Sequence, residues 1–268
     1  MCRAISEHYF YSIEPFWNTL PAYHPRRSPS NDFMMLNSRH GTQPINCVPG
    51  NGQIGLILQQ TDDGITGKCY GVLKERREVV LRGQEDSDSP LYLLCFAPGS
   101  FAKICRMPMN LIDPCGIEVS DVFSREQLER IQSAAALEDA DEQLFRLFNQ
   151  WIEAGSLSAI SARNITDEVI RTIWVRKGNV QIRELEEHTL YSARYLEKLI
   201  INNVGITPKQ MCNQIRFQHA MHLLKNEQGI SHKELALQLG YNDQAHYCKV
   251  FKRYSGRTPA EYVSQNKI

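Results

Sequence analysis

The sequence has no long apolar segment and no secretion signal. None of its apolar runs approaches the ~20 residues that a membrane-spanning helix needs. Its N-terminus also lacks a basic stretch followed by an apolar one. We therefore expect a cytoplasmic protein that has no membrane partner. At 268 residues, the chain is long enough for two domains of modest size.

Motifs for catalysis and for cofactor binding are missing as well. The sequence has no P-loop, no Gly-rich nucleotide motif and no Ser/His/Asp order typical of hydrolases. Its eight cysteines form no C-x-x-C pair, and His8, His24 and His40 form no H-x-H pair. We expect no enzyme, no metal and no cofactor. The alternative, a small cysteine-based enzymatic domain, would use Cys47 or Cys69 as its nucleophile.

An excess of charge of either sign is absent from the chain as a whole, but not from its parts. The chain holds 30 Lys and Arg against 30 Asp and Glu. Residues 165–268 hold 15 of these basic residues and 10 of the acidic ones, a net charge of +5, so residues 1–164 carry −5. This asymmetry predicts that only the second part of the chain meets a polyanion.

Residues 1–118 have the pattern of a β-rich domain. Short apolar runs at 54–58, 79–81 and 91–96 are separated by clusters rich in Pro, Gly, Asn and Asp. Several short strands punctuated in this way predict a sandwich or a small barrel. Its aromatic residues are expected in the core or around a ligand pocket, and they include Trp17, Tyr23, Phe33 and Tyr70.

The pattern becomes helical after Ser124. Ser124 and Gln127 form a capping box, and apolar residues then recur at helical spacing to about Ala154, with a break near Glu138. The segment that follows, rich in Ser and Ala, is the best linker candidate. We therefore divide the chain into a β-rich sensor or dimerisation domain with C-terminal helices (1–155), a linker (156–164) and an all-α domain (165–268).

The all-α part contains the same plan twice. In residues 180–208, a short amphipathic helix precedes a turn, a helix capped by Ser192 and a terminating Gly205. Residues 230–259 repeat this order with Asp243 as the cap and Gly256 at the end. Thr-Pro follows each glycine and begins another helix. The two caps are 51 residues apart, as are the two glycines, so the sequence contains an internal repeat.

The capped helix of each repeat predicts one buried stripe and one outward polar face. The expected core residues are Leu196, Leu199, Ala236, Leu239 and Phe251. The expected outward residues are Arg194, Glu197 and Lys198 in the first repeat, and Gln244, Ala245, His246 and Lys249 in the second.

A short helix that follows a tight turn and presents Arg, Lys, Gln and His is suited to reading the major groove of DNA. A long helix from Pro208 to about Lys225 would join the two helix-turn-helix units. One chain would then touch two successive major-groove segments, about 34 Å apart. The alternative is a helical bundle whose polar faces are merely solvated.

The stretch from Val180 to Tyr262 resembles the AraC/XylS family of bacterial transcription regulators. The segments that carry the resemblance include residues 192–199 (SARYLEKL), 239–247 (LGYNDQAHY) and 251–259 (FKRYSGRTP). The resemblance implies a double helix-turn-helix domain in which the outward residues given above contact DNA. Ala245 stands where Ser is commoner in the family, so it offers only an apolar contact, for instance to a thymine methyl.

The N-terminal part is similar to the degenerate cupin-like sensor domains of that family. Residues 48–52 (VPGNG) and 95–99 (CFAPG) carry this similarity. The resemblance implies a regulator, commonly an activator, with promoter or operator DNA and RNA polymerase as partners. A small-molecule effector or a protein partner at the N-terminal domain is also implied, as is a homodimer. The other alternative is an N-terminal domain that only binds protein.

Overall fold

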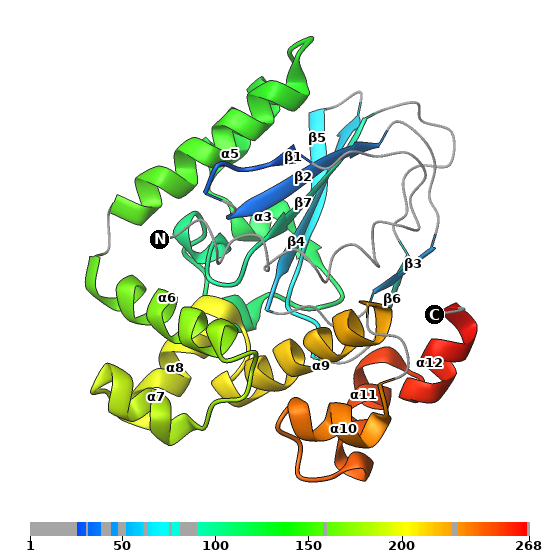
Figure 1. Ribbon diagram of the computed structural model, residues 1–268. Helices are drawn as coiled ribbons and strands as arrows, with labels where there is room; N and C mark the ends of the chain where they lie inside the picture. The colour runs from blue at the N-terminus through cyan, green and yellow to red at the C-terminus, as the bar shows by residue number, and fades with distance from the viewer. Residues whose placement is uncertain are drawn as a thin grey trace.

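A computed structural model places a β-rich N-terminal part above a set of C-terminal helices (Figure 1). The structure describes residues 26–30, 32–38, 44–47, 52–61, 64–74, 77–80, 90–157, 160–226 and 230–266. This arrangement confirms the expected α+β fold class with an all-α C-terminal part. The three histidines considered above as metal ligands, together with Trp17 and Tyr23, lie outside the described residues.

Within the described residues, six strands form one antiparallel sheet in the order β1-β2-β7-β4-β5-β8. They are β1 (Arg26–Arg27), β2 (Phe33–Ser38), β4 (Ile54–Thr61), β5 (Gly64–Tyr70), β7 (Leu91–Phe96) and β8 (Ile117–Glu118). The predicted strands at 54–58 and 91–96 are confirmed as β4 and β7. In β4, Ile54, Leu56 and Leu58 are buried, as the two-residue period of a strand requires.

Two further strands form a separate antiparallel ribbon. β3 (Pro44–Cys47) pairs with β6 (Arg77–Val80), and Ile45 lies opposite Val79 in the register. The first two residues of the apolar run predicted at 79–81 therefore end β6, and the third lies outside the described residues. The sheet and the ribbon together make the N-terminal part β-rich, as the turn clusters of the sequence indicate.

Helices follow the strands and pack on the sheet. They are α3 (Val119–Val122), α4 (Arg125–Ala135) and α5 (Ala140–Leu157), preceded by the 3-10 turns η2 (Phe101–Lys103) and η3 (Met109–Leu111). The predicted capping box is confirmed, because the Ser124 side chain accepts from the Gln127 N–H and the Gln127 side chain accepts from the Ser124 N–H. The predicted break between the two helices is confirmed as well.

An aromatic cluster joins the sheet to α5. The ring centroid of Phe33 lies 5.6 Å from that of Phe96 on β7 and 5.3 Å from that of Phe145 on α5. Phe148 packs edge-on against Phe96 at 5.9 Å. Phe33 is fully buried and Tyr70 is half-buried, so Phe33 belongs to the core rather than to the lining of an open pocket.

In the described residues of the C-terminal part, the helices are α6 (Ile160–Val175), α7 (Ile182–Thr189), α8 (Ala193–Val204), α9 (Pro208–Asn226), α10 (His232–Gln238), α11 (Gln244–Ser255) and α12 (Pro259–Asn266). The sequence predicts an irregular linker at 156–164, but α5 and α6 enter this segment from both ends. Ala favours helix and Ser tolerates it, so a Ser- and Ala-rich stretch does not by itself end one. The boundaries at 155 and 165 stay a prediction.

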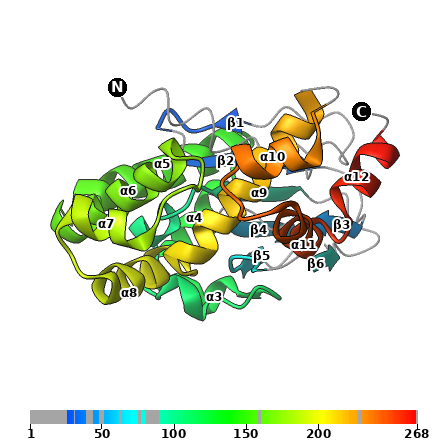
Figure 2. The same ribbon diagram turned by 60° about the horizontal axis from the view of Figure 1, so that its bottom comes forward.

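The buried apolar residues fall into two cores. One runs from the sheet through α6, α7 and α8 to Ile215 in α9, and the other joins Phe217 in α9 to α10, α11 and α12. Both views show α9 between the two groups of helices, with α6, α7 and α8 at one end and α10, α11 and α12 at the other (Figures 1 and 2). Among the described residues, no helix is long and apolar enough to cross a membrane.

Candidate nucleic-acid interface

The first helix-turn-helix unit consists of α7, a tight turn and α8. Leu190 ends α7 in the left-handed conformation at φ 62°, and its N–H donates to the Glu186 carbonyl at 2.8 Å. Ser192 then caps α8, because its Oγ accepts from the Tyr195 N–H at 3.4 Å. Gly205 ends α8 at φ 96°, a conformation that favours glycine. The predicted cap and terminating glycine are confirmed.

The second unit has the same construction in α10 and α11. Ser231 and Glu234 form a capping box at the start of α10. The Asp243 carboxylate accepts from the His246 N–H at 2.6 Å, and Gly256 ends α11 at φ 78°. The internal repeat found in the sequence therefore corresponds to two equivalent units.

The predicted buried stripes are confirmed with one difference. Leu196, Ala236, Leu239 and Phe251 are buried, whereas Leu199 is half-buried. The inner stripe of α8 runs through Leu196, Ile200 and Val204, each four residues from the next. Leu199 lies three residues beyond Leu196 and therefore occupies the flank of that stripe.

The outward faces of α8 and α11 carry the side chains that the sequence selects. All of them are exposed: Arg194, Glu197, Lys198, Gln244, Ala245, His246 and Lys249. Arg194 and Lys198 are four residues apart and so lie on one face of α8, and neither has an ion-pair partner among the described residues. The His246 ring packs edge-on against Tyr241 at 5.4 Å, which restrains it. The DNA contacts of these residues stay a prediction.

Two exposed tyrosines at the start of α8 are absent from the prediction. Tyr191 and Tyr195 stack with their ring centroids 4.8 Å apart and are 42% and 40% exposed. Leu190 beside them is 88% exposed. The spacing of four residues across the Ser192 cap is the signal that could have identified the stacked pair.

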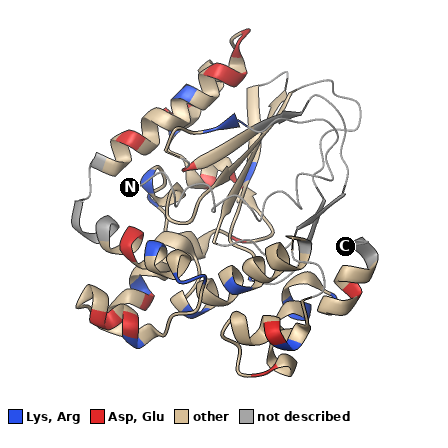
Figure 3. Cartoon of the chain, viewed as in Figure 1, with Lys and Arg blue, Asp and Glu red and all other residues tan. Residues whose placement is uncertain are grey.

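The two units differ in charge. Residues 165–205 hold 6 Lys and Arg and 6 Asp and Glu, so the first unit with α6 is neutral. Residues 206–268 hold 9 basic and 4 acidic residues, so the whole excess of +5 lies on α9 and the second unit. Both signs are interspersed over α6 and α7 (Figure 3). A polyanion would therefore be attracted mainly by α9 and the second unit together.

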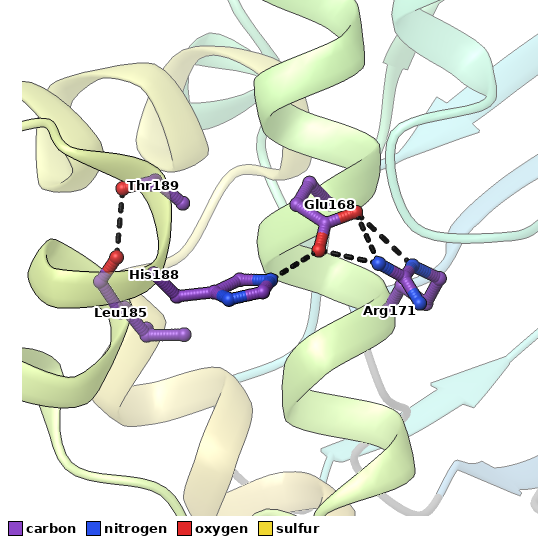
Figure 4. Close-up of polar contacts among 5 residues, drawn as sticks. All are labelled: Glu168, Arg171, Leu185, His188 and Thr189. Carbon is purple, nitrogen blue, oxygen red and sulfur yellow. Dashed lines mark hydrogen bonds and ion pairs between the residues drawn. The ribbon is translucent and has the colours of Figure 1, made fainter.

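A polar contact braces the first unit against α6. Glu168 on α6 lies between Arg171 and His188, the latter in the last turn of α7 (Figure 4). The His188 Nε2 lies 2.5 Å from a carboxylate oxygen of Glu168. Hydrogen bonds from Arg171 and then His188 outweigh the effect of burial and hold the pKa of Glu168 below its usual value. The sequence pattern gives no signal for this contact, because its partners lie 20 residues apart.

Cys69, one of the two cysteines considered above as a nucleophile, lies in surroundings that disfavour its thiolate. Cys69 is fully buried on β5, and burial raises the pKa of its thiol far above the ordinary value, with Cys105 adding to the increase. A thiol in this state is a poor nucleophile, so the structure argues against Cys69 in an enzymatic role. The side chain of Cys47 lies outside the described residues. In the part of the chain that is described, no three His, Cys, Asp or Glu residues are placed to hold a metal ion.

Comparison with known proteins identifies the C-terminal part. Residues 185–265 match the family model of a helix-turn-helix domain. An uncharacterized HTH-type transcriptional regulator of Haemophilus influenzae is 31% identical over 111 residues, which cover 41% of this chain and 37% of the relative. The uncharacterized transcriptional regulatory protein YesN of Bacillus subtilis is 29% identical over 149 residues, or 54% and 39% of the two chains. The chain thus spans about two fifths of the length of these curated relatives.

The solved structures that align with this chain are more distant in sequence. ToxT from Vibrio cholerae aligns with 87% of this chain and 97% of its own, at a TM-score of 0.39 and 14% identity. The C-terminal domain of AraT, a response regulator from Geobacillus stearothermophilus, covers 41% of this chain and 88% of its own, at a TM-score of 0.35 and 22% identity.

Proposed function

We propose that this chain, whose residues 185–265 form a helix-turn-helix domain of the AraC/XylS type, is a sequence-specific DNA-binding transcriptional regulator. In this proposal, α8 and α11 read two successive major-groove segments. The observation that carries it is the repeated geometry: two capped helices, each after a tight turn, present exposed Arg, Lys, Gln and His side chains.

Each outward side chain has a chemistry suited to DNA. The Arg194 guanidinium can donate two hydrogen bonds to one guanine, and the Gln244 amide can pair with adenine. Glu197 can accept from the cytosine amino group, and Ala245 can contact a thymine methyl. Lys198, His246 and Lys249 are suited to phosphates as well as to bases, so they would contribute both affinity and register.

The N-terminal part would control this activity. Its sheet shares a core with the first unit, so a change in the sheet is able to reach α8 through packed side chains. We propose an activator at promoter DNA that contacts RNA polymerase, with an effector or a second copy of the chain acting on the N-terminal domain. A purely protein-binding N-terminal domain is the other candidate. Under that candidate, small molecules would shift neither the thermal stability of the chain nor its DNA affinity.

The test is selection of bound sequences from a random DNA pool by the full chain. Arg194→Ala and Gln244→Ala are run in parallel, with Arg125→Ala as a control that removes one exposed Arg from α4. We expect an asymmetric two-part motif, with each reading-helix variant relaxing a different part and weakening binding by about 1–3 kcal/mol. The control keeps the wild-type motif. If neither the full chain nor residues 165–268 select a motif, the proposed function is wrong.

A further inference from the structure

Three segments meet on one turn of α9. The first is the turn after α6, where Lys177 and Gly178 are left-handed at φ 53° and 75°. A Cβ on Gly178 would lie 2.3 Å from the Cys212 carbonyl oxygen and 2.9 Å from Cγ of Arg216, so this turn packs directly on α9. The second segment is α9 itself, at Arg216. The third is the turn of the second helix-turn-helix unit, at Gly240.

Arg216 joins α9 to the turn of the second unit. Its Nη1 donates to the Gly240 carbonyl at 3.2 Å, and its Nη2 donates to Asn213 Oδ1 at 2.8 Å. Its guanidinium carbon lies 5.1 Å from the centroid of the Tyr241 ring. Among the described residues it has no carboxylate within ion-pair distance, so a carbonyl, an amide and a ring face hold this cation. The contact therefore fixes the position of the turn at Gly240 relative to α9, and it does not neutralise the charge of Arg216.

Asn179 completes the junction from the side of the first unit. Gly240 has φ +72°, and a Cβ at that position would lie 2.4 Å from Asn179 Oδ1. The segment that leads into α7 thus touches the turn that leads into α11. Gln244, the first residue of α11, follows four residues after Gly240. The start of the second reading helix is therefore held relative to the first unit.

We propose that Arg216 and Asn179 are positioning residues that set the spacing between the two parts of the DNA site. This inference rests on the proposed function. The two units pack on α9 through separate apolar cores, the second through Phe217, and the contacts of Arg216 and Asn179 at Gly240 add a polar link between the two units. Inserting one base pair moves one half of a site by about 3.4 Å and rotates it by about 35°. A rigid pair of reading helices would not tolerate that change.

The experiment measures binding of the full chain to duplexes that carry the selected motif with its own spacer, or with one base pair inserted or deleted. We expect each spacer change to weaken wild-type binding by about tenfold or more. In Arg216→Ala the loss should fall to about threefold or less, with weaker binding to the original spacer. Arg216→Lys should behave in the same way, because lysine keeps the charge but has no planar fork. Asn179→Ala should relax the spacing less.

Lys209→Ala is the matched control, since it removes an exposed cation from the first turn of α9. It should weaken binding to every spacer by the same factor. A wild-type spacing penalty that persists in Arg216→Lys and Asn179→Ala overturns the inference, even if Arg216→Ala does not fold. A two-part motif that the wild-type chain binds equally well at every spacing also overturns it. Failure of the wild-type chain to select any motif instead removes the proposed function.

Discussion

The two helix-turn-helix units share their caps and their terminating glycines but differ in what they pack against. The first unit belongs to the core that begins in the β-sheet, whereas the second has a core of its own around Phe251. The first unit together with α6 is neutral, and the second unit together with α9 carries the whole positive excess. The same helix caps and terminating glycines therefore occur in two units whose tertiary packing and charge differ.

This difference suggests that the two units have different roles in DNA binding and in its control. The second unit and α9 together would supply most of the sequence-independent attraction to DNA, because that attraction comes from neutralising phosphates. α9 touches the N-terminal part at Gln214, which donates to the Leu73 carbonyl at 2.7 Å, and the first unit touches it at Gly205, which lies against Met109. The first unit is therefore the one through which the N-terminal part can act. The predictions below test this comparison.

The largest effect on stability is expected from truncating one large buried side chain in each core. Phe251→Ala should cost about 3–5 kcal/mol and Leu196→Ala about 2–5 kcal/mol. Hydrogen exchange of the full chain, read by mass spectrometry, should show that Phe251→Ala loosens α10, α11 and α12 and leaves the sheet protected. Leu196→Ala should lower protection in the sheet as well as in α7 and α8. If Phe251→Ala also opens the sheet, the two cores are not independent.

Local signals predict the units well because caps and turns depend on neighbouring residues. Ser192, Asp243 and the two glycines could all be identified from the sequence, as could the outward face of α8. The sequence predicts α9 only as a connecting helix. It is buried on several sides, at Cys212, Gln214 and Phe217 for example, because the sheet and both units pack around it.

The contacts that no periodic pattern predicts join residues far apart in the chain. Gln214 reaches Leu73 across 141 residues, and Arg216 reaches Gly240 across 24. From the sequence alone, a polar side chain on α9 is expected to face solvent. Its hydrogen-bond partner comes close only in the folded chain. The half-buried position of Leu199 is a smaller example, since it depends on which side of α8 meets the core.

A smaller effect is expected when the N-terminal part is removed. In a fragment of residues 165–268, Val204 and Ile206 lose neighbours in the shared core, and Gln214 loses Leu73. Exposing one such side chain costs about 1.5–3 kcal/mol, so hydrogen exchange in α7 and α8 should speed up accordingly. Exchange in α10 and α11 should stay as in the full chain. Equal loosening of both units would contradict the division between them.

The salt dependence of DNA binding should distinguish the contributions of the two units. Each substitution is expected to change the free energy of binding by about 1 kcal/mol. Lys249→Ala should weaken binding across all sequences and reduce the slope of log affinity against log salt by about 1, as expected for a lost phosphate contact. Arg194→Ala should relax specificity at one part of the site and leave the slope nearly unchanged. Titrations at several salt concentrations measure both. A larger slope change for Arg194→Ala would place the electrostatic contribution in the first unit.

The smallest effect concerns the brace between α6 and α7, which only the first unit has among the described residues. Glu168→Gln weakens the contacts to Arg171 and His188, and such partly exposed pairs contribute about 0–1 kcal/mol. Because folding lowers the pKa of Glu168, its contribution is present above the usual carboxyl pKa and is lost as the pH falls through the lower folded value.

The stability difference between wild type and Glu168→Gln should therefore be seen at neutral pH and decrease at acid pH, as the Glu168 carboxylate becomes protonated. Hydrogen exchange in α7, measured at both pH values, gives this difference for the first unit alone. Glu187→Gln, which removes an exposed partner of Arg183 on α7, serves as the control and should change little at either pH. A Glu168→Gln effect of the same size at both pH values would mean that shape, and not the carboxylate charge, holds α7 against α6. An effect in α10 and α11 would show that the two units are coupled more tightly than their separate cores indicate.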